Sequence, residues 1–216
     1  MITERAAEYY AKSASGIDRA YDKPERQDDL AGMRAHVAGA LRGHTVLELA
    51  CGAGYWTRVI AETADAVVAT DINAEMIALA QLRGLPADKV EFRVADAFDL
   101  PGDLGDFTAV FIGFWWSHVR RDEQERFLAQ LRSKVGKDVM LVLVDDAYVE
   151  GSSDTVARTD LEGNTYQIRT APDGERYEIP KNYPSDSALR KKLAGAVREI
   201  KIVRGEYYWM LTGRLK

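Results

Sequence analysis

Short apolar runs alternate with segments of helical spacing along most of this 216-residue chain, and this alternation most restricts its fold. Strands that are apolar on both faces and separated by helices are typical of a parallel sheet with helices on both sides. We therefore predict an α/β fold with a doubly wound, mostly parallel sheet. The five strands predicted on this pattern are residues 45–49, 66–71, 90–94, 107–112 and 139–144.

Both ends of the chain depart from this pattern. Before the first strand, we expect a short helix over residues 4–12. A second helix should begin near Pro24 and carry its apolar stripe at Leu30, Met33, Val37 and Leu41. After the fifth strand, residues 165–169 and 176–179 flank a Pro-Asp-Gly turn, which predicts an inserted hairpin.

The last part of the chain predicts a helix capped by Ser185, followed by strands over residues 199–203 and 207–212. The tight connection between these strands, through Arg204 and Gly205, permits only an antiparallel pair. The sheet should therefore have seven strands and end in an antiparallel hairpin. We predict one domain over residues 1–216. Its parts are a helical cap (1–41), a cofactor-binding core (42–149), an insertion forming a lid or hairpin (150–184) and a last helix with two strands (185–216).

Charge and cysteine content exclude several classes of function. Lys and Arg total 29 against 34 Asp and Glu, a net charge of -5, so we expect no nucleic-acid partner. The apolar runs are too short to span a membrane, and a charged N-terminus without an apolar core after it predicts a cytoplasmic protein. A single cysteine, Cys51, excludes an intrachain disulfide and a cysteine-based zinc site, and we expect no metal.

The strongest local signal is the segment Glu-Leu-Ala-Cys-Gly-Ala-Gly at residues 48–54, where the first strand turns into a helix. Ligands of open α/β sheets bind at this carboxyl end of the strands. Gly52 and Gly54 allow a sharp turn and a close approach of the backbone to a ligand. Two glycines can equally be structural turn residues without a ligand.

Three acidic residues reinforce the ligand interpretation, because Glu48, Asp71 and Asp96 each lie at the end of a successive predicted strand. Asp71 is suitably spaced to accept hydrogen bonds from ribose hydroxyls, and Asp96 could receive an adenine amine while Phe98 or Ile72 covers the ring. Each acid alone could be a helix or loop cap. Their joint placement around a Gly-rich turn indicates a nucleotide-type ligand.

With these motifs, residues 41–216 resemble the class I S-adenosylmethionine-dependent methyltransferases. The resemblance implies S-adenosylmethionine as cofactor and S-adenosylhomocysteine as product. It implies contacts from Gly52 and Gly54 to the methionine and ribose parts, from Asp71 to the ribose and from Asp96 to the adenine amine. Ala50 stands where the family usually has its first glycine. The residues expected around the cofactor are Glu48, Ala50, Gly52, Gly54, Asp71, Ile72, Met76, Asp96, Ala97, Phe98, Gly113 and Tyr21.

Two other interpretations of the Gly-rich turn stay open: an NAD(P)-dependent oxidoreductase and a non-catalytic nucleotide-binding module. The dinucleotide fingerprint fits less well, because Thr57 stands at the position of its third glycine. Glu48 would also repel a pyrophosphate, whereas it favours the ammonium group of a methionine.

The methyl acceptor is expected next to the segment after the fourth strand, residues 113–118. We predict a small, partly apolar molecule methylated on oxygen or nitrogen by a monomer or homodimer. His118, whose usual pKa lies near neutrality, is the candidate base, although it could instead cap the next helix. The tryptophans could be core residues, and the acids after strand five could be solvated. The residues predicted to bind the acceptor are Tyr10, Phe114, Trp115, Trp116, Asp145 and Tyr148.

Overall fold

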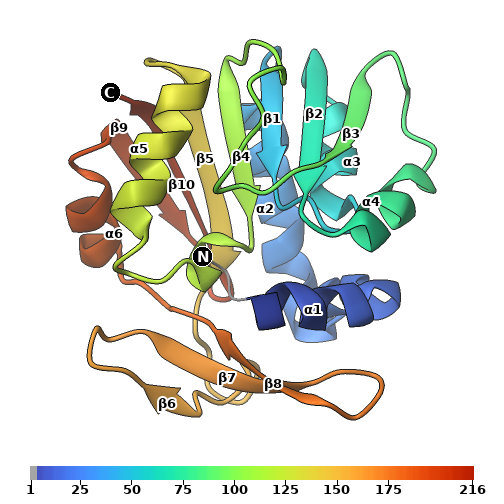
Figure 1. Ribbon diagram of the computed structural model, residues 1–216. Coiled ribbons are helices and arrows are strands. Elements are labelled where there is room, and N and C mark those ends of the chain that lie inside the picture. Colours follow the sequence, from blue (N-terminus) through green and yellow to red (C-terminus); the bar gives the residue numbers. More distant parts are fainter. Residues whose placement is uncertain (1–3) are drawn as a thin grey trace.

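A seven-stranded sheet forms the centre of the computed structural model, which describes residues 4–216 (Figure 1). Its strands are β1 (Thr45–Leu49), β2 (Ala66–Asp71), β3 (Val90–Val94), β4 (Ala109–Gly113), β5 (Met140–Asp146), β9 (Val197–Arg204) and β10 (Tyr208–Leu215). Their order is β3-β2-β1-β4-β5-β10-β9. The first five are parallel, and β10 pairs antiparallel with both β5 and β9. The predicted fold class is confirmed.

Helices cover both faces of the large sheet. One face packs on α2 (Gln27–Ala40), α3 (Tyr55–Ala61) and α4 (Ala74–Gln81). The other packs on α5 (Gln124–Val135) and α6 (Asp186–Leu193). Because successive strand residues point to opposite faces, both faces of the central strands are apolar and buried.

The predicted helices at the N-terminus are present. A first helix, α1 (Glu4–Lys12), leads through 3₁₀ turns η1 (Ala14–Tyr21) and η2 (Pro24–Arg26) into α2. The predicted apolar stripe of α2 is buried against the large sheet. Pro24 begins the 3₁₀ turn rather than the helix itself, consistent with its fixed φ and missing N–H.

A second, three-stranded sheet is made by the insertion, with strands β6 (Arg158–Thr159), β7 (Thr165–Thr170) and β8 (Arg176–Pro180). The predicted turn connects β7 and β8 into a hairpin. Strand β6 has only two residues, too few for a recognisable alternation of side chains. In Figure 1, α1 and this sheet lie beyond the carboxyl ends of β1 to β5, and α1 packs on β8.

Several predicted boundaries need correction. The fourth strand begins at Ala109 rather than at residue 107, and the fifth extends to Asp146. Ser185 caps α6 as predicted, since its hydroxyl accepts from the Ala188 N–H. Asn73 occupies the N-cap position of α4, where Asp71 accepts the hydrogen bond of the Asn73 N–H.

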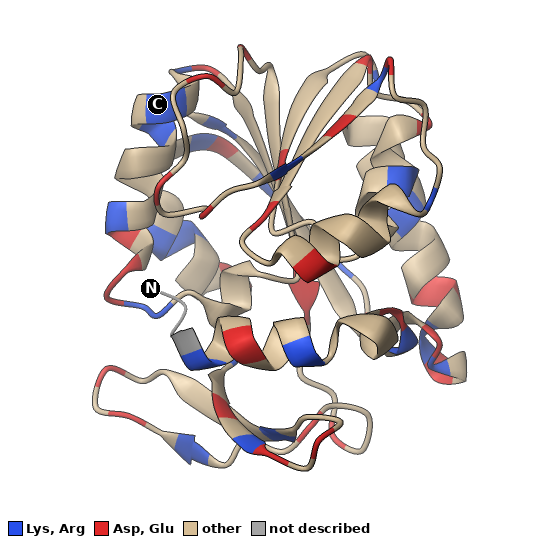
Figure 2. Cartoon of the chain, turned by 45° about the vertical axis from the view of Figure 1, so that its right-hand side comes forward, with Lys and Arg blue, Asp and Glu red and all other residues tan. Residues whose placement is uncertain are grey.

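Acidic and basic residues are interspersed along the helices and loops visible in Figure 2. Within residues 4–216, no helix is long and apolar enough to cross a membrane. Over the same residues, no group of three or more His, Cys, Asp or Glu side chains is placed to hold a metal ion.

Candidate functional site

A cavity of about 1160 Å³ lies at the carboxyl ends of the parallel strands. Its wall has three sources: the strand ends and following turns of the large sheet, the cap, and the insertion. Residues far apart in sequence therefore enclose one space, large enough for a nucleotide-sized cofactor together with a small molecule.

The Gly-rich turn after β1 has an unusual backbone. Ala50, Gly52 and Gly54 all have positive φ, at 55°, 55° and 78°. A Cβ added at Gly52 would enter open space, so its backbone is free to approach a ligand. A Cβ at Gly54 would lie 3.0 Å from the Cβ of Ala80, so this glycine serves the packing of α3 on α4.

Glu48 reaches the cavity from β1. Its side chain is buried, and its Oε2 has no hydrogen-bond partner among residues 4–216. Burial raises the pKa of Glu48 to about 8, because water no longer stabilises the ionised form. The unsatisfied oxygen leaves room for a donor or cation on a ligand.

Asp71, at the end of β2, holds the turn in place. One carboxylate oxygen accepts from the Gly52 N–H at 2.9 Å and the other from the Asn73 N–H at 2.9 Å. Burial raises the pKa of Asp71, and these backbone hydrogen bonds oppose the rise. Each oxygen keeps a lone pair for a ligand hydroxyl.

The turn after β3 supplies an apolar and a polar group to the same cavity. Asp96 accepts from the Phe98 N–H at 2.8 Å, which orders the turn. Ile72, directly after β2, is half exposed at the cavity, so its side chain is open to a ligand there. Met76 and Ala97 complete this wall.

The segment after β4 contributes an aromatic wall. Phe114 has a φ of 58°, and its ring stacks on Trp56 and meets the edges of Tyr21 and Tyr208. Gly113 must lack a side chain, because a Cβ there would lie 2.9 Å from the Phe111 ring. This tight packing orients Phe114 and Trp115 at the cavity.

His118 ends the 3₁₀ turn η3 (Trp116–His118) and is buried at the cavity wall. Its Nδ1 lies 2.5 Å from the Pro180 carbonyl, which can only accept, so Nδ1 carries the proton. The unprotonated Nε2 then accepts from the Tyr10 hydroxyl at 2.9 Å. Burial lowers the pKa of His118 well below its usual range, and the charges of Lys181 and Arg169 lower it further. His118 is therefore neutral at pH 7.

Most of the predicted site residues meet in this cavity, and four lie outside its lining. Gly54 packs on Ala80, as described. Trp116 is buried in the core against Phe127, with the ring centroids 6.2 Å apart. Tyr148 packs edge-on against Tyr183. The predicted site residues that line the cavity are Tyr10, Tyr21, Glu48, Ala50, Gly52, Asp71, Ile72, Met76, Asp96, Ala97, Phe98, Gly113, Phe114, Trp115 and His118.

Asp145 is the fourth residue outside the lining, and it is fully buried. Its carboxylate accepts from the Ser117 N–H and hydroxyl at 2.8 and 2.9 Å and pairs with Lys181 at 2.9 Å. It therefore anchors η3, and with it His118, to the insertion.

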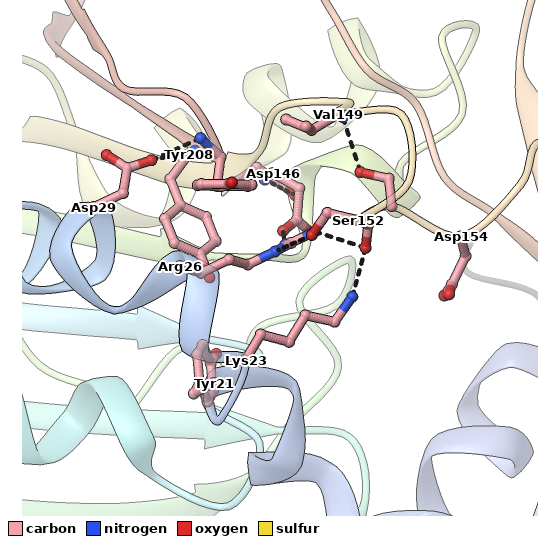
Figure 3. A network of polar contacts seen from close by, with 12 residues as sticks. Tyr21, Lys23, Arg26, Asp29, Asp146, Val149, Ser152, Asp154 and Tyr208 are labelled. Atoms are coloured by element: carbon pink, nitrogen blue, oxygen red, sulfur yellow. Dashed lines mark hydrogen bonds and ion pairs between the residues drawn. The ribbon is translucent and has the colours of Figure 1, made fainter.

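The prediction from sequence missed basic residues from the cap and the insertion that line the cavity. Figure 3 shows part of this arrangement: Arg26 lies between Asp146 and Ser152, and Lys23 donates to the Ser152 carbonyl. Arg169 reaches the cavity from β7, and Lys181 reaches it from the position directly after β8. In the sequence these residues look like ordinary solvated charges, because nothing local distinguishes them.

Comparison with known proteins agrees with this geometry. Residues 46–137 match the family profile described as "Methyltransferase domain". The structure of DhpI in complex with SAH superimposes with a TM-score of 0.78 and 32% sequence identity, over 98% of this chain and 96% of DhpI. The chain belongs to the class I S-adenosylmethionine-dependent methyltransferases. A second DhpI structure, equally similar at 32% identity and a TM-score of 0.78, is a complex with SAM and HEP.

Curated methyltransferases also match, over shorter segments. The demethylmenaquinone methyltransferase of Clavibacter sepedonicus is 40% identical over 77 residues, which cover 36% of this chain. The match covers 31% of the length of that relative, so the chain spans about a third of it. S-adenosylmethionine is the cofactor of the present chain. The unsatisfied Glu48 oxygen and the open Gly52 backbone fit a cationic, nucleotide-like ligand of this kind.

Proposed function

We propose that this chain transfers a methyl group from S-adenosylmethionine to oxygen or nitrogen of a small, partly apolar molecule. One observation carries the proposal: a single cavity joins the acidic strand ends to an aromatic wall and to the neutral His118–Tyr10 pair. When bound, the cofactor supplies a methyl group on a positively charged sulfur, so the protein has mainly to align the acceptor and exclude water.

In this proposal the cofactor lies along the edge formed by β1, β2 and β3. Asp71 binds the ribose hydroxyls, Asp96 the adenine amine, and Ile72 and Phe98 cover the ring. Glu48 faces the positively charged methionine part. Each of these groups lines the same cavity, which supports the assignment.

The acceptor then lies between Phe114, Trp115 and the insertion. For an acceptor that must lose a proton, the neutral His118 receives it, with Tyr10 between His118 and the acceptor. The partial match to demethylmenaquinone methyltransferases supports S-adenosylmethionine as the methyl donor. Because the match covers only about a third of this chain, the identity of the acceptor is not inferred from it.

Two measurements test the proposal. S-adenosylhomocysteine at about 100 times its Kd should stabilise the fold by roughly 2.7 kcal/mol, and NADH should have no effect. Labelled S-adenosylmethionine should label at least one member of a panel of phenols, amines, thiols and carboxylic acids. Stabilisation by NADH without stabilisation by S-adenosylhomocysteine would refute the methyltransferase assignment.

Variants at two positions test the roles of individual residues. Asp71→Ala should weaken S-adenosylhomocysteine binding about tenfold or more, because a charge-assisted hydrogen bond to the ribose is lost. His118→Ala should lower turnover and leave this affinity unchanged. Equal affinity in Asp71→Ala, or full turnover in His118→Ala, would remove the corresponding role.

A further inference from the structure

The charged residues that the ends of β1 to β3 contribute to the cavity wall are all acids, whereas the cap, the end of β5 and the insertion contribute four basic residues together with Asp18, Asp146 and Asp154. Glu48, Asp71 and Asp96 lie at the strand ends of the core. The lining residues of the cap and the insertion include four basic side chains, Lys23, Arg26, Arg169 and Lys181. The cap and the insertion line the part of the cavity in which the proposed function places the acceptor.

Two of these basic residues are neutralised by the chain itself. Lys181 is buried and lies 2.9 Å from Asp145 and 2.7 Å from Asp146. The Arg26 guanidinium lies 3.2 Å from the other carboxylate oxygen of Asp146. These two cations and two carboxylates form a balanced group that ties the cap to β5 and the insertion, and it has no charge left over for a ligand.

Arg169 differs, because its close partners are neutral. Its guanidinium donates to the Tyr10 hydroxyl at 3.2 Å and to the Gln167 side-chain oxygen at 3.0 Å. Its Nε is closed to solvent and has no hydrogen-bond partner among residues 4–216. The nearby carboxylate, Asp154, is 4.0 Å away and largely exposed. This guanidinium thus has only one long ion pair, to an exposed carboxylate, and one hydrogen-bond donor without a partner among the described residues.

Lys23 adds to the same imbalance. Its ammonium donates to the neutral Ser152 carbonyl, at the point where the cap meets the insertion (Figure 3). The positive field is also evident at His118, whose pKa is lowered by burial and then by Lys181 and Arg169. A positive field in a partly desolvated cavity favours an anion.

We infer that the methyl acceptor carries an oxyanion, a carboxylate or a phosphate-type group, bound by Arg169 together with Tyr10. The inference rests on the proposed function and narrows its acceptor class to acids. A guanidinium is suited to this role because its planar fork matches two oxygens of one group. The apolar part of such an acceptor lies against Phe114 and Trp115.

An oxyanion also changes what the neighbouring residues have to do. When its oxygen takes the methyl group, the oxygen–carbon bond forms, the carbon–sulfur bond breaks with its electron pair going to sulfur, and the two opposite charges cancel. No proton is released, so no base is required. In that reaction the neutral His118 acts as a positioning residue, holding the Tyr10 hydroxyl beside Arg169.

The test measures binding to protein saturated with S-adenosylhomocysteine, by calorimetry at constant ionic strength. The probes are butyrate, propylphosphonate and the neutral butyramide. We expect both acids to bind, and butyramide to bind at least about tenfold more weakly. The stronger of the two acids indicates whether a carboxylate or a phosphate-type group is preferred.

Arg169→Gln should weaken binding of the acids about 10- to 100-fold, whereas Arg169→Lys should retain part of it. Arg158→Gln is the matched control, because Arg158 belongs to the same small sheet but pairs with Glu178 outside the cavity. Unchanged affinity for S-adenosylhomocysteine shows that each variant is folded. Equal binding of butyramide and butyrate, no binding of either acid, or equal effects of Arg169→Gln and Arg158→Gln would overturn the inference.

The labelled-methyl panel separates this inference from the proposed function. Labelling of a carboxylic acid as its methyl ester supports both. Labelling of amines or phenols with no acid labelled would overturn the oxyanion inference and leave the proposed function standing. Failure to bind S-adenosylhomocysteine would instead remove the proposed function.

Discussion

Glu48 makes the stability of the ligand-free protein depend on pH. Burial raises the pKa of Glu48 from its usual 4.5 to about 8. Between these values the folded protein holds a proton that the unfolded chain has released, so stability falls as the pH rises. From pH 6 to pH 8 the expected loss is about 2 kcal/mol, equivalent to roughly 4–8 °C in Tm for a chain of this size.

Glu48→Gln isolates this effect, because glutamine has nearly the same shape and stays neutral. The free energy of unfolding is measured by urea denaturation at pH 6, 7 and 8 for both proteins. The advantage of the variant should grow by about 2 kcal/mol over this range. The buried Asp71 is present in both proteins, so its own titration largely cancels in the difference. A difference between the two proteins that is the same at all three pH values would refute the reasoning.

Three further substitutions and one control test local structure by urea denaturation at pH 6. Gly54→Ala should lose about 2 kcal/mol, because it adds a Cβ at a φ of 78° and 3.0 Å from the Ala80 Cβ; no loss would contradict the packing argument. Ala50→Gly should gain up to about 1 kcal/mol, since it removes a Cβ from a residue with a φ of 55°. Ser185→Ala should lose about 1 kcal/mol with the α6 cap, whereas Ser187→Ala, within the same helix, should change stability less.

The fold could be predicted because its signals are local. A strand that is buried on both faces must be largely apolar, so the central strands β1, β2, β4 and β5 stand out in the sequence. A tight turn restricts the backbone, so the glycines after β1 stand out as well. Because parallel strands end at one edge of the sheet, Glu48, Asp71 and Asp96 could be placed at that edge in advance, and in the structure all three line the cavity.

The acceptor end of the cavity could be predicted only in part. Trp115 and Trp116 are adjacent in sequence and both pack on Phe127, yet only Trp115 also lines the cavity. Asp145 resembled a candidate ligand-binding acid, and the structure pairs it with Lys181, 36 residues later in the chain. No local sequence pattern predicts such a partner.

The sequence by itself determined the sheet, its antiparallel end and the acidic edge at the cavity, since these depend on residue type and short-range spacing. Only the tertiary structure decided which charges are neutralised. Arg169 meets Tyr10 across 159 residues and Arg26 meets Asp146 across 120, because the cap and the insertion fold over the same strand ends. Electrostatic balance depends on distances between such side chains, and chain folding sets those distances.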